Sequence, residues 1–98
     1  MAKKLRSVFT DDMDHCYFTD TPYCHRHHIF YGSRRELSET YNFIIPLAHY
    51  LHENYPGSVH DNPNHGLDLE LKQMAQTYFE EHHGTREDFI NVFGRSWL

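Results

Sequence analysis

Two stretches near the C-terminus carry apolar residues at the spacing of an amphipathic helix. The first predicts a helix over 67–83 that stops at Gly84, and the second predicts a helix over 86–93 with Thr85 as its N-terminal cap. The apolar stripes of the two predicted helices consist of Leu67, Leu71, Met74, Ala75, Tyr78, Phe79, Phe89, Ile90 and Phe93. We expect these stripes to supply most of the recognisable core.

Two shorter segments in the first half are rich in the Tyr, Phe, Thr and Ile residues that favour strands. They cover 15–19 and 23–30, and the turn at 20–22 between them predicts a β-hairpin. The residues before the hairpin are polar and show little periodicity. We therefore expect an irregular arm over 1–14 and one domain over 15–98, because a chain of 98 residues has room for one modest core.

Shorter elements are predicted between the hairpin and the C-terminal helices. Ser33, with Glu36 three residues later, resembles a capping box and predicts a short helix over 34–41. The apolar run at 43–45 predicts a short buried extended segment.

A further helix is predicted to begin at Pro46, which suits the first turn of a helix. It is expected to end near Asn54, because a Pro-Gly pair follows. Residues 56–66 are then a loop. Strands in the first half and helices in the second half together predict an α+β fold.

The composition is that of an ordinary globular protein, with 39% hydrophobic and 23% charged residues. No run approaches the roughly 20 apolar residues of a membrane span, and no apolar stretch follows the basic start, so we expect neither a membrane segment nor a signal peptide. The expected location is the cytoplasm. The net charge of −5 argues against a protein that grips nucleic acid by charge alone, so any affinity for a polyanion must be local.

Histidine is unusually frequent, and enrichment of this kind indicates metal binding. The ten histidines are His15, His25, His27, His28, His49, His52, His60, His65, His82 and His83. We expect His82 and His83 to be surface residues, because a partly protonated imidazole suits the negative end of a helix.

The adjacent pair His27-His28 lies on the second predicted strand. Side chains alternate along a strand, so one imidazole can bind an ion while its neighbour acts on a group beside that ion. His52 and His60 follow at separations that suit the same site. We predict His27, His52 and His60 as ligands and His28 as the general base of metal-assisted hydrolysis, since imidazole titrates near neutral pH.

Other polar residues are expected near this site. Arg34 and Arg35 follow the histidine pair closely enough to contact a phosphate group. His25 and His49 fall on the strand and helix faces that carry predicted ligands. We expect neither His25 nor His49 to bind the metal, and His49 to lie either beside the ligands or on the surface.

Cys16 and Cys24 flank the turn of the predicted hairpin. A disulfide across the hairpin is geometrically possible, but in a cytosolic chain we expect free thiols. A zinc site built on them would lack the usual Cys-x-x-Cys pair.

A set of short segments carries a family resemblance. The segments are His27-His28-Ile29-Phe30, Phe43-Ile44-Ile45-Pro46-Leu47, His52, Val59-His60, Leu67-Asp68-Leu69-Glu70-Leu71-Lys72-Gln73-Met74, Gly84-Thr85-Arg86-Glu87-Asp88-Phe89-Ile90 and Phe93-Gly94-Arg95. Together they resemble the HNH endonuclease superfamily, and more narrowly the small bacteriophage proteins related to the RecA-dependent recombination-enhancement nuclease. The resemblance spans residues 15–98 and is most specific at the histidine pair and in the tail.

The resemblance implies a fold of the ββα-metal type, with a β-hairpin, a metal-site helix and two additional C-terminal helices. In that family the first residue of the histidine pair binds the metal and the second is the general base, which corresponds to His27 and His28. The helix histidine that completes the site corresponds to His52, and a later one corresponds to His60.

Residues and resemblance together predict a divalent-metal-dependent DNA endonuclease, encoded by a phage, that hydrolyses phosphodiester bonds with one ion. Imidazole ligands suit Zn²⁺, Ni²⁺ or Mn²⁺, and open coordination positions also admit Mg²⁺. The chain shows no sequence-reading element, so a protein partner could direct its specificity.

Two alternatives stay open. A non-catalytic metal-binding module would use the same histidines in a closed site with four ligands. An inhibitor or binding protein on an inactivated HNH scaffold would instead gather its carboxylates on one face.

Overall fold

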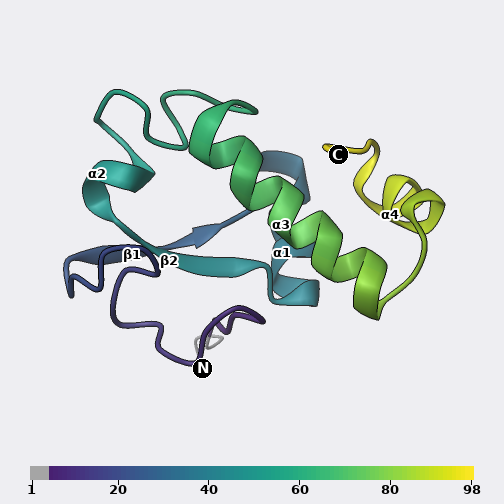
Figure 1. Cartoon of the computed structure of the whole chain (residues 1–98), viewed down its shortest axis with the longest axis horizontal. Helices are drawn as coiled ribbons and strands as arrows, with labels where there is room; N and C mark the ends of the chain where they lie inside the picture. Colours follow the sequence, from purple (N-terminus) through teal and green to yellow (C-terminus); the bar gives the residue numbers. More distant parts are fainter. Residues whose placement is uncertain (1–4) are drawn as a thin grey trace.

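Two antiparallel strands and several helices make up an α+β fold (Figure 1). The computed structural model describes residues 5–98, so the first four residues of the expected N-terminal arm lie outside the described part. The elements are β1 (Cys24–His28), the 3₁₀-helix η1 (Gly32–Arg34), α1 (Arg35–Tyr41), β2 (Ile44–Ala48), α2 (His49–His52), α3 (Gly66–His82) and α4 (Arg86–Phe93). Within residues 5–98, no helix has the length and apolarity that crossing a bilayer requires.

β1 and β2 pair antiparallel, and residues directly opposite each other share one face of the sheet. His27 lies opposite Ile45, and His28 lies opposite Ile44, so the register assigns the two histidines to different faces. Every residue of β2 is buried, because this strand carries the main apolar run of the first half. The extended segment predicted at 43–45 is therefore confirmed in part, because β2 begins one residue later and continues to Ala48.

The predicted hairpin is wrong, because the strand partner of 23–30 is β2 and not 15–19. The earlier segment belongs to a turn, closed by a hydrogen bond of 2.8 Å from the Cys16 amide to the Thr21 carbonyl. Asp20 has a left-handed conformation in this turn, with a φ of 63°. A fully buried apolar strand gives β1 more apolar contact than a polar turn does, which explains the choice of partner.

The start predicted for the helix from Pro46 to Asn54 is also wrong, because Pro46 lies inside β2 and α2 is a single turn. The N–H and C=O positions of one residue in an antiparallel strand point to the same side. The Pro46 carbonyl points to the outer edge, where it accepts a bond of 2.8 Å from the Tyr17 amide. The absent N–H of this proline therefore removes no hydrogen bond between β1 and β2.

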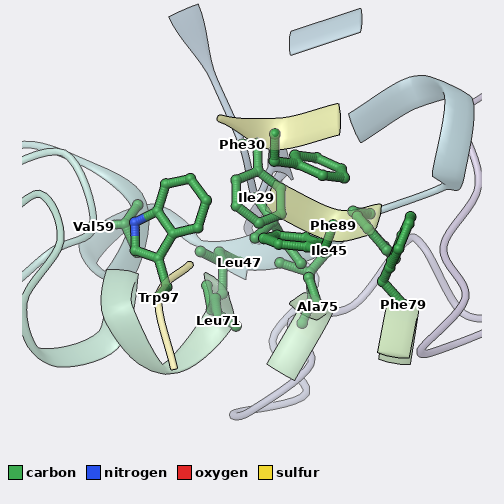
Figure 2. Packing of buried hydrophobic residues seen from close by; sticks show 12 residues of the cluster. Ile29, Phe30, Ile45, Leu47, Val59, Leu71, Ala75, Phe79, Phe89 and Trp97 are labelled. Atoms are coloured by element: carbon green, nitrogen blue, oxygen red, sulfur yellow. The ribbon is translucent and has the colours of Figure 1, made fainter. Parts of the chain in front are cut away.

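The two predicted C-terminal helices are confirmed as α3 and α4, and Figure 2 shows the core that they form with the sheet. Thr85 caps α4 as predicted, in a capping box with Asp88. Core side chains from β2, α3, α4 and the tail include Ile45, Leu47, Leu71, Ala75, Phe79, Phe89 and Trp97. In Figure 1, α2 and the loop after it lie toward one end of the sheet, and α4 lies toward the other.

The helix predicted over 34–41 is confirmed as α1, but its predicted start is not. Ser33 lies in η1, and no side chain caps α1, so the capping box with Glu36 is wrong. Ser38 makes the decisive polar contact of this helix, because its buried hydroxyl accepts from the Phe30 amide at 2.8 Å and donates to the Phe30 carbonyl at 2.7 Å. These two bonds fix α1 against the segment that follows β1.

We expect Ser38→Ala to lower the free energy of unfolding by about 1–3 kcal/mol, because it leaves two buried backbone groups of Phe30 without partners. Thr40→Ala is the matched control, since the Thr40 hydroxyl only donates to the Glu36 carbonyl on the exposed side of the same helix. That control should change stability by less than about 0.5 kcal/mol. Urea denaturation followed by circular dichroism measures both, and equal effects would contradict this account of α1.

Candidate metal centre

β1 brings His27 to the end of the sheet face that forms the core. Along this face Ile29 belongs to the core, and His27 and His25 follow at alternate positions toward the start of the strand. The His27 side chain is 2% exposed, and its Nε2 atom has no hydrogen-bond partner. Since an unpaired buried nitrogen is energetically costly, His27 fits the role of a metal ligand.

The single turn of α2 and the loop after it supply the next two histidines. His52 is the last residue of α2, and His60 lies in the loop. The backbone holds this loop against α2, because the Val59 amide donates to the Leu51 carbonyl at 2.9 Å and the His60 amide donates to the His52 carbonyl at 3.2 Å. The Nε2 atoms of His52 and His60 are then 3.0 Å apart.

The structure thus brings the three predicted ligands together. One ring nitrogen from each of His27, His52 and His60 lies within 4.8 Å of the other two. The ring centroid of His27 lies 5.0 Å from that of His52 and 5.3 Å from that of His60. Nitrogens this close need little movement to converge on one divalent ion with bonds of about 2.1 Å, and three imidazoles leave further coordination positions open.

The electrostatic environment keeps His27 and His52 neutral. Burial, followed by the neighbouring imidazoles of His52 and His60, lowers the pKa of His27 to about 2. Burial and His60 also lower the pKa of His52 to about 4, although Glu53 has the opposite effect. Both rings are therefore unprotonated at neutral pH, which is the form that binds a metal ion.

His28 contacts a different element from His27, as strand alternation predicts. The His28 side chain is 6% exposed, and its Nε2 atom lies 3.4 Å from the Glu39 carboxylate of α1. A carboxylate beside an imidazole orients the ring and favours its protonated form. Glu39 was not a candidate from the sequence, because no local spacing rule relates a strand to the helix after it.

A cavity of about 190 Å³ reaches side chains from both faces of β1. β1 has a partner strand on one side only, so a cavity at its free edge can border adjacent residues that point to opposite faces. The residues that line it are Arg26, His27, His28, Tyr31, Arg35, His52 and His60. The predicted base, the predicted ligands and one of the two predicted phosphate-binding arginines thus share a single cavity.

Arg34, the other predicted phosphate-binding residue, lies in a neighbouring cavity of about 250 Å³. Its Nε atom donates to the carbonyl that ends α4 at 2.6 Å, and its guanidinium carbon lies 5.4 Å from the centre of the Trp97 ring. Lys72 and Arg95 line the same cavity, and Tyr31 lines both cavities. Arg34 therefore lines a different cavity from the histidine cluster, and Tyr31 borders both cavities.

Tyr31 and Lys72 are neighbours of the cluster that sequence reasoning missed. The Tyr31 ring centroid lies 4.8 Å from that of His60, and the Lys72 ammonium lies 4.5 Å from the Tyr31 ring. Lys72 is 5% exposed and pairs with the Asp68 carboxylate at 2.8 Å. Burial and Asp68 raise the pKa of Tyr31 to about 12, so its hydroxyl stays protonated. The sequence signal that could have revealed Lys72 is its spacing of four residues from Asp68, which allows an ion pair on one side of a helix.

The two cysteines are free thiols, as expected. Cys16 is buried and Cys24 is half-buried. None of the groups of potential metal ligands found among residues 5–98 includes either of them. A role for the cysteines in the candidate metal centre therefore has no support.

Comparisons with protein-family models, with curated proteins and with solved structures find no match to this chain.

The metal-free protein should lose stability as the pH falls below about 6.5. Burial holds the folded-state pKa of His27 at about 2, whereas an unfolded histidine titrates near 6.5, so the unfolded chain binds more protons between these values. The stability from this group is therefore complete above the unfolded value and falls by up to about 1.4 kcal/mol per pH unit below it. Urea denaturation in the presence of a chelator, from about pH 7.5 to about pH 5.5, measures the slope.

His27→Leu should reduce the slope of this pH dependence, because it removes one of the two histidines whose pKa the fold lowers, and the slope that remains comes from His52. The control is His82→Leu, which changes an exposed histidine in the last turn of α3. A slope that His27→Leu leaves unchanged would show that His27 is not held neutral by the fold.

Proposed function

We propose that the protein is a divalent-metal-dependent DNA endonuclease that hydrolyses phosphodiester bonds. One observation carries the proposal: three imidazoles that can converge on an ion share a cavity with a fourth imidazole that is paired with a carboxylate. A metal site alone requires only the first three. The fourth, His28, is what hydrolysis requires in addition, because it can take a proton from water.

The arrangement of elements supports a ββα-metal core. In this proposal β1 and β2 are the two strands and α2 is the metal-site helix, while α3 and α4 are the additional C-terminal helices. His27 comes from the first strand, His52 from the helix and His60 from the loop after it. The proposed hairpin differs from the one that the sequence predicted, because its second strand follows α1 rather than preceding β1.

His27, His52 and His60 would hold the ion, and their chemistry suits Zn²⁺, Ni²⁺ or Mn²⁺, with Mg²⁺ admitted through open positions. A bound ion would supply positive charge that stabilises the developing charge on the phosphate and on the leaving oxygen. The buried, unpaired Nε2 atom of His27 is the observation in the structure that best fits this role.

His28 is the proposed general base, and Glu39 is its positioning residue. A water oxygen bonds to phosphorus as its proton passes to the His28 imidazole, and the bond from phosphorus to the leaving oxygen breaks. The imidazolium that forms lies beside the Glu39 carboxylate, at 3.4 Å in the resting structure, which stabilises the positive charge. The leaving oxygen takes its proton from solvent.

Arginines around the cavities would bind the phosphate backbone despite the net charge of −5. Arg35 lines the histidine cavity and is largely exposed, so it can reach a phosphate at the reacting position. Arg34 and Arg95 line the neighbouring cavity, where they would contact a flanking phosphate. The basic charge is thus local, and a protein partner would supply the sequence specificity that these contacts lack.

We expect His28→Ala to abolish plasmid cleavage and to leave metal content nearly unchanged, because it removes the base and keeps all three ligands. His27→Ala should reduce both cleavage and metal content. The assay measures nicking and cutting of plasmid DNA with Mg²⁺, Mn²⁺, Zn²⁺ and Ni²⁺, alongside elemental analysis of protein purified without a histidine tag.

His82→Ala, at the exposed end of α3, is the matched control and should behave as the parent protein does. Cleavage by His28→Ala at the parental rate would overturn the assignment of the base. A parent protein that binds metal but cuts no DNA with any of these ions would favour the non-catalytic module. A metal-free, inactive parent would favour the inactivated scaffold.

We expect Glu39→Gln to lower the single-turnover rate constant at saturating DNA by at least about tenfold, because the neutral amide no longer stabilises the His28 imidazolium. The DNA concentration for half-maximal rate and the metal content should stay near the parental values. Glu39→Asp, which restores the charge on a shorter side chain, should recover part of the rate. A loss of DNA affinity or metal with unchanged rate at saturation would contradict the positioning role.

A further inference from the structure

A second group of potential ligands lies directly beside the first. It consists of His25, His49 and Glu53, and one donor atom from each lies within 4.8 Å of the other two. We propose that this group is a second binding site for a divalent transition-metal ion, with Zn²⁺ as the best-suited ion. The proposal goes beyond the nuclease reaction and does not depend on it.

The potential ligands on the helical turn of α2 belong to two different groups: His49 and Glu53 to the second, and His52 to the first. His49 and Glu53 are four residues apart, and the Glu53 amide donates to the His49 carbonyl at 3.0 Å, so both side chains lie on one side of the turn. His52, in the same turn, instead contacts His60 of the first group. β1 makes the same division, since His25 and His27 are alternate residues about 7 Å apart on one face.

The donor set and spacing suit a transition-metal ion. Two imidazoles and one carboxylate form a recognised zinc ligand set, with bonds of about 2.0–2.2 Å. The Nδ1 atom of His25 lies 3.9 Å from the Glu53 carboxylate, and the ring centroids of His25 and His49 are 4.8 Å apart. The side chains of His25 and Glu53 are each 43% exposed, so an ion can reach them from solvent and keep water in its remaining positions.

The His52 ring lies between the two groups and connects them. Its Nδ1 atom is 2.8 Å from Nδ1 of His25, and its Nε2 atom is 3.0 Å from Nε2 of His60. An ion bound by His49 and Glu53 would restrain the helical turn that also carries His52, and groups that hold a ligand imidazole in place raise metal affinity. The second ion thus has a structural role: it fixes the turn that presents His52 to the first site.

Zinc stoichiometry of the tag-free full chain tests the proposal. After dialysis against micromolar Zn²⁺, the parent should retain two ions per chain, and His49→Ala and Glu53→Gln should each retain one. His60→Ala, which weakens only the first site, should also retain one, and the double variant His49→Ala/His60→Ala should retain none. The exposed positions His82→Ala and Glu87→Gln are the controls and should retain two.

The combination of results separates this site from the proposed nuclease site. If the parent and both second-site variants hold equal zinc, the second site is overturned, whether or not the parent cleaves DNA. If one ion remains in His60→Ala and is lost in His49→Ala, the second site stands even where the first fails. Glu53→Gln keeps the size of a half-exposed side chain, so it should fold, and near-ultraviolet circular dichroism checks this for every variant.

Discussion

The antiparallel register of β1 on β2 is the constraint on which the rest of the structure depends. It sets His27 opposite Ile45 on the face that forms the core, and it directs His28 toward Glu39 of α1. A shift of one residue would exchange the two faces of β1 and reverse these roles. Because β2 is buried along its whole length, the hydrophobic core fixes the register before any ion binds.

The C-terminal half of the fold could be predicted from the sequence because its signals are local. Thr85 and Asp88 cap α4 within one turn, and the apolar stripe of α3 repeats within one helix. The first half was predicted less well, because the partner of a strand is chosen by burial and not by proximity. A polar turn at Asp20 was the nearest candidate along the chain, yet the apolar strand beyond α1 gave the better partner.

The candidate site shows the same division between local and distant information. The residue type and the position on a strand were enough to choose His27 and His28 as candidate site residues. The structure then brings His52 and His60 close to His27. Glu39 and Lys72 could not be selected, because they come from helices whose packing against β1 no spacing rule describes. Arg34 and Arg35 are neighbours in sequence, but successive side chains along a helix point about 100° apart, and the two arginines line different cavities.

The burial of His27 also sets the order in which a metal centre of this kind would assemble. His27 is a buried residue on a strand. His52 is half-buried at the end of a short helical turn, and His60 is exposed in a loop. An arriving ion would therefore bind His60 and His52 first. His27 would bind last, and its imidazole would displace a water molecule from the ion at the edge of the core. Release would follow the reverse path, and the bond to the buried His27 would be the first to break.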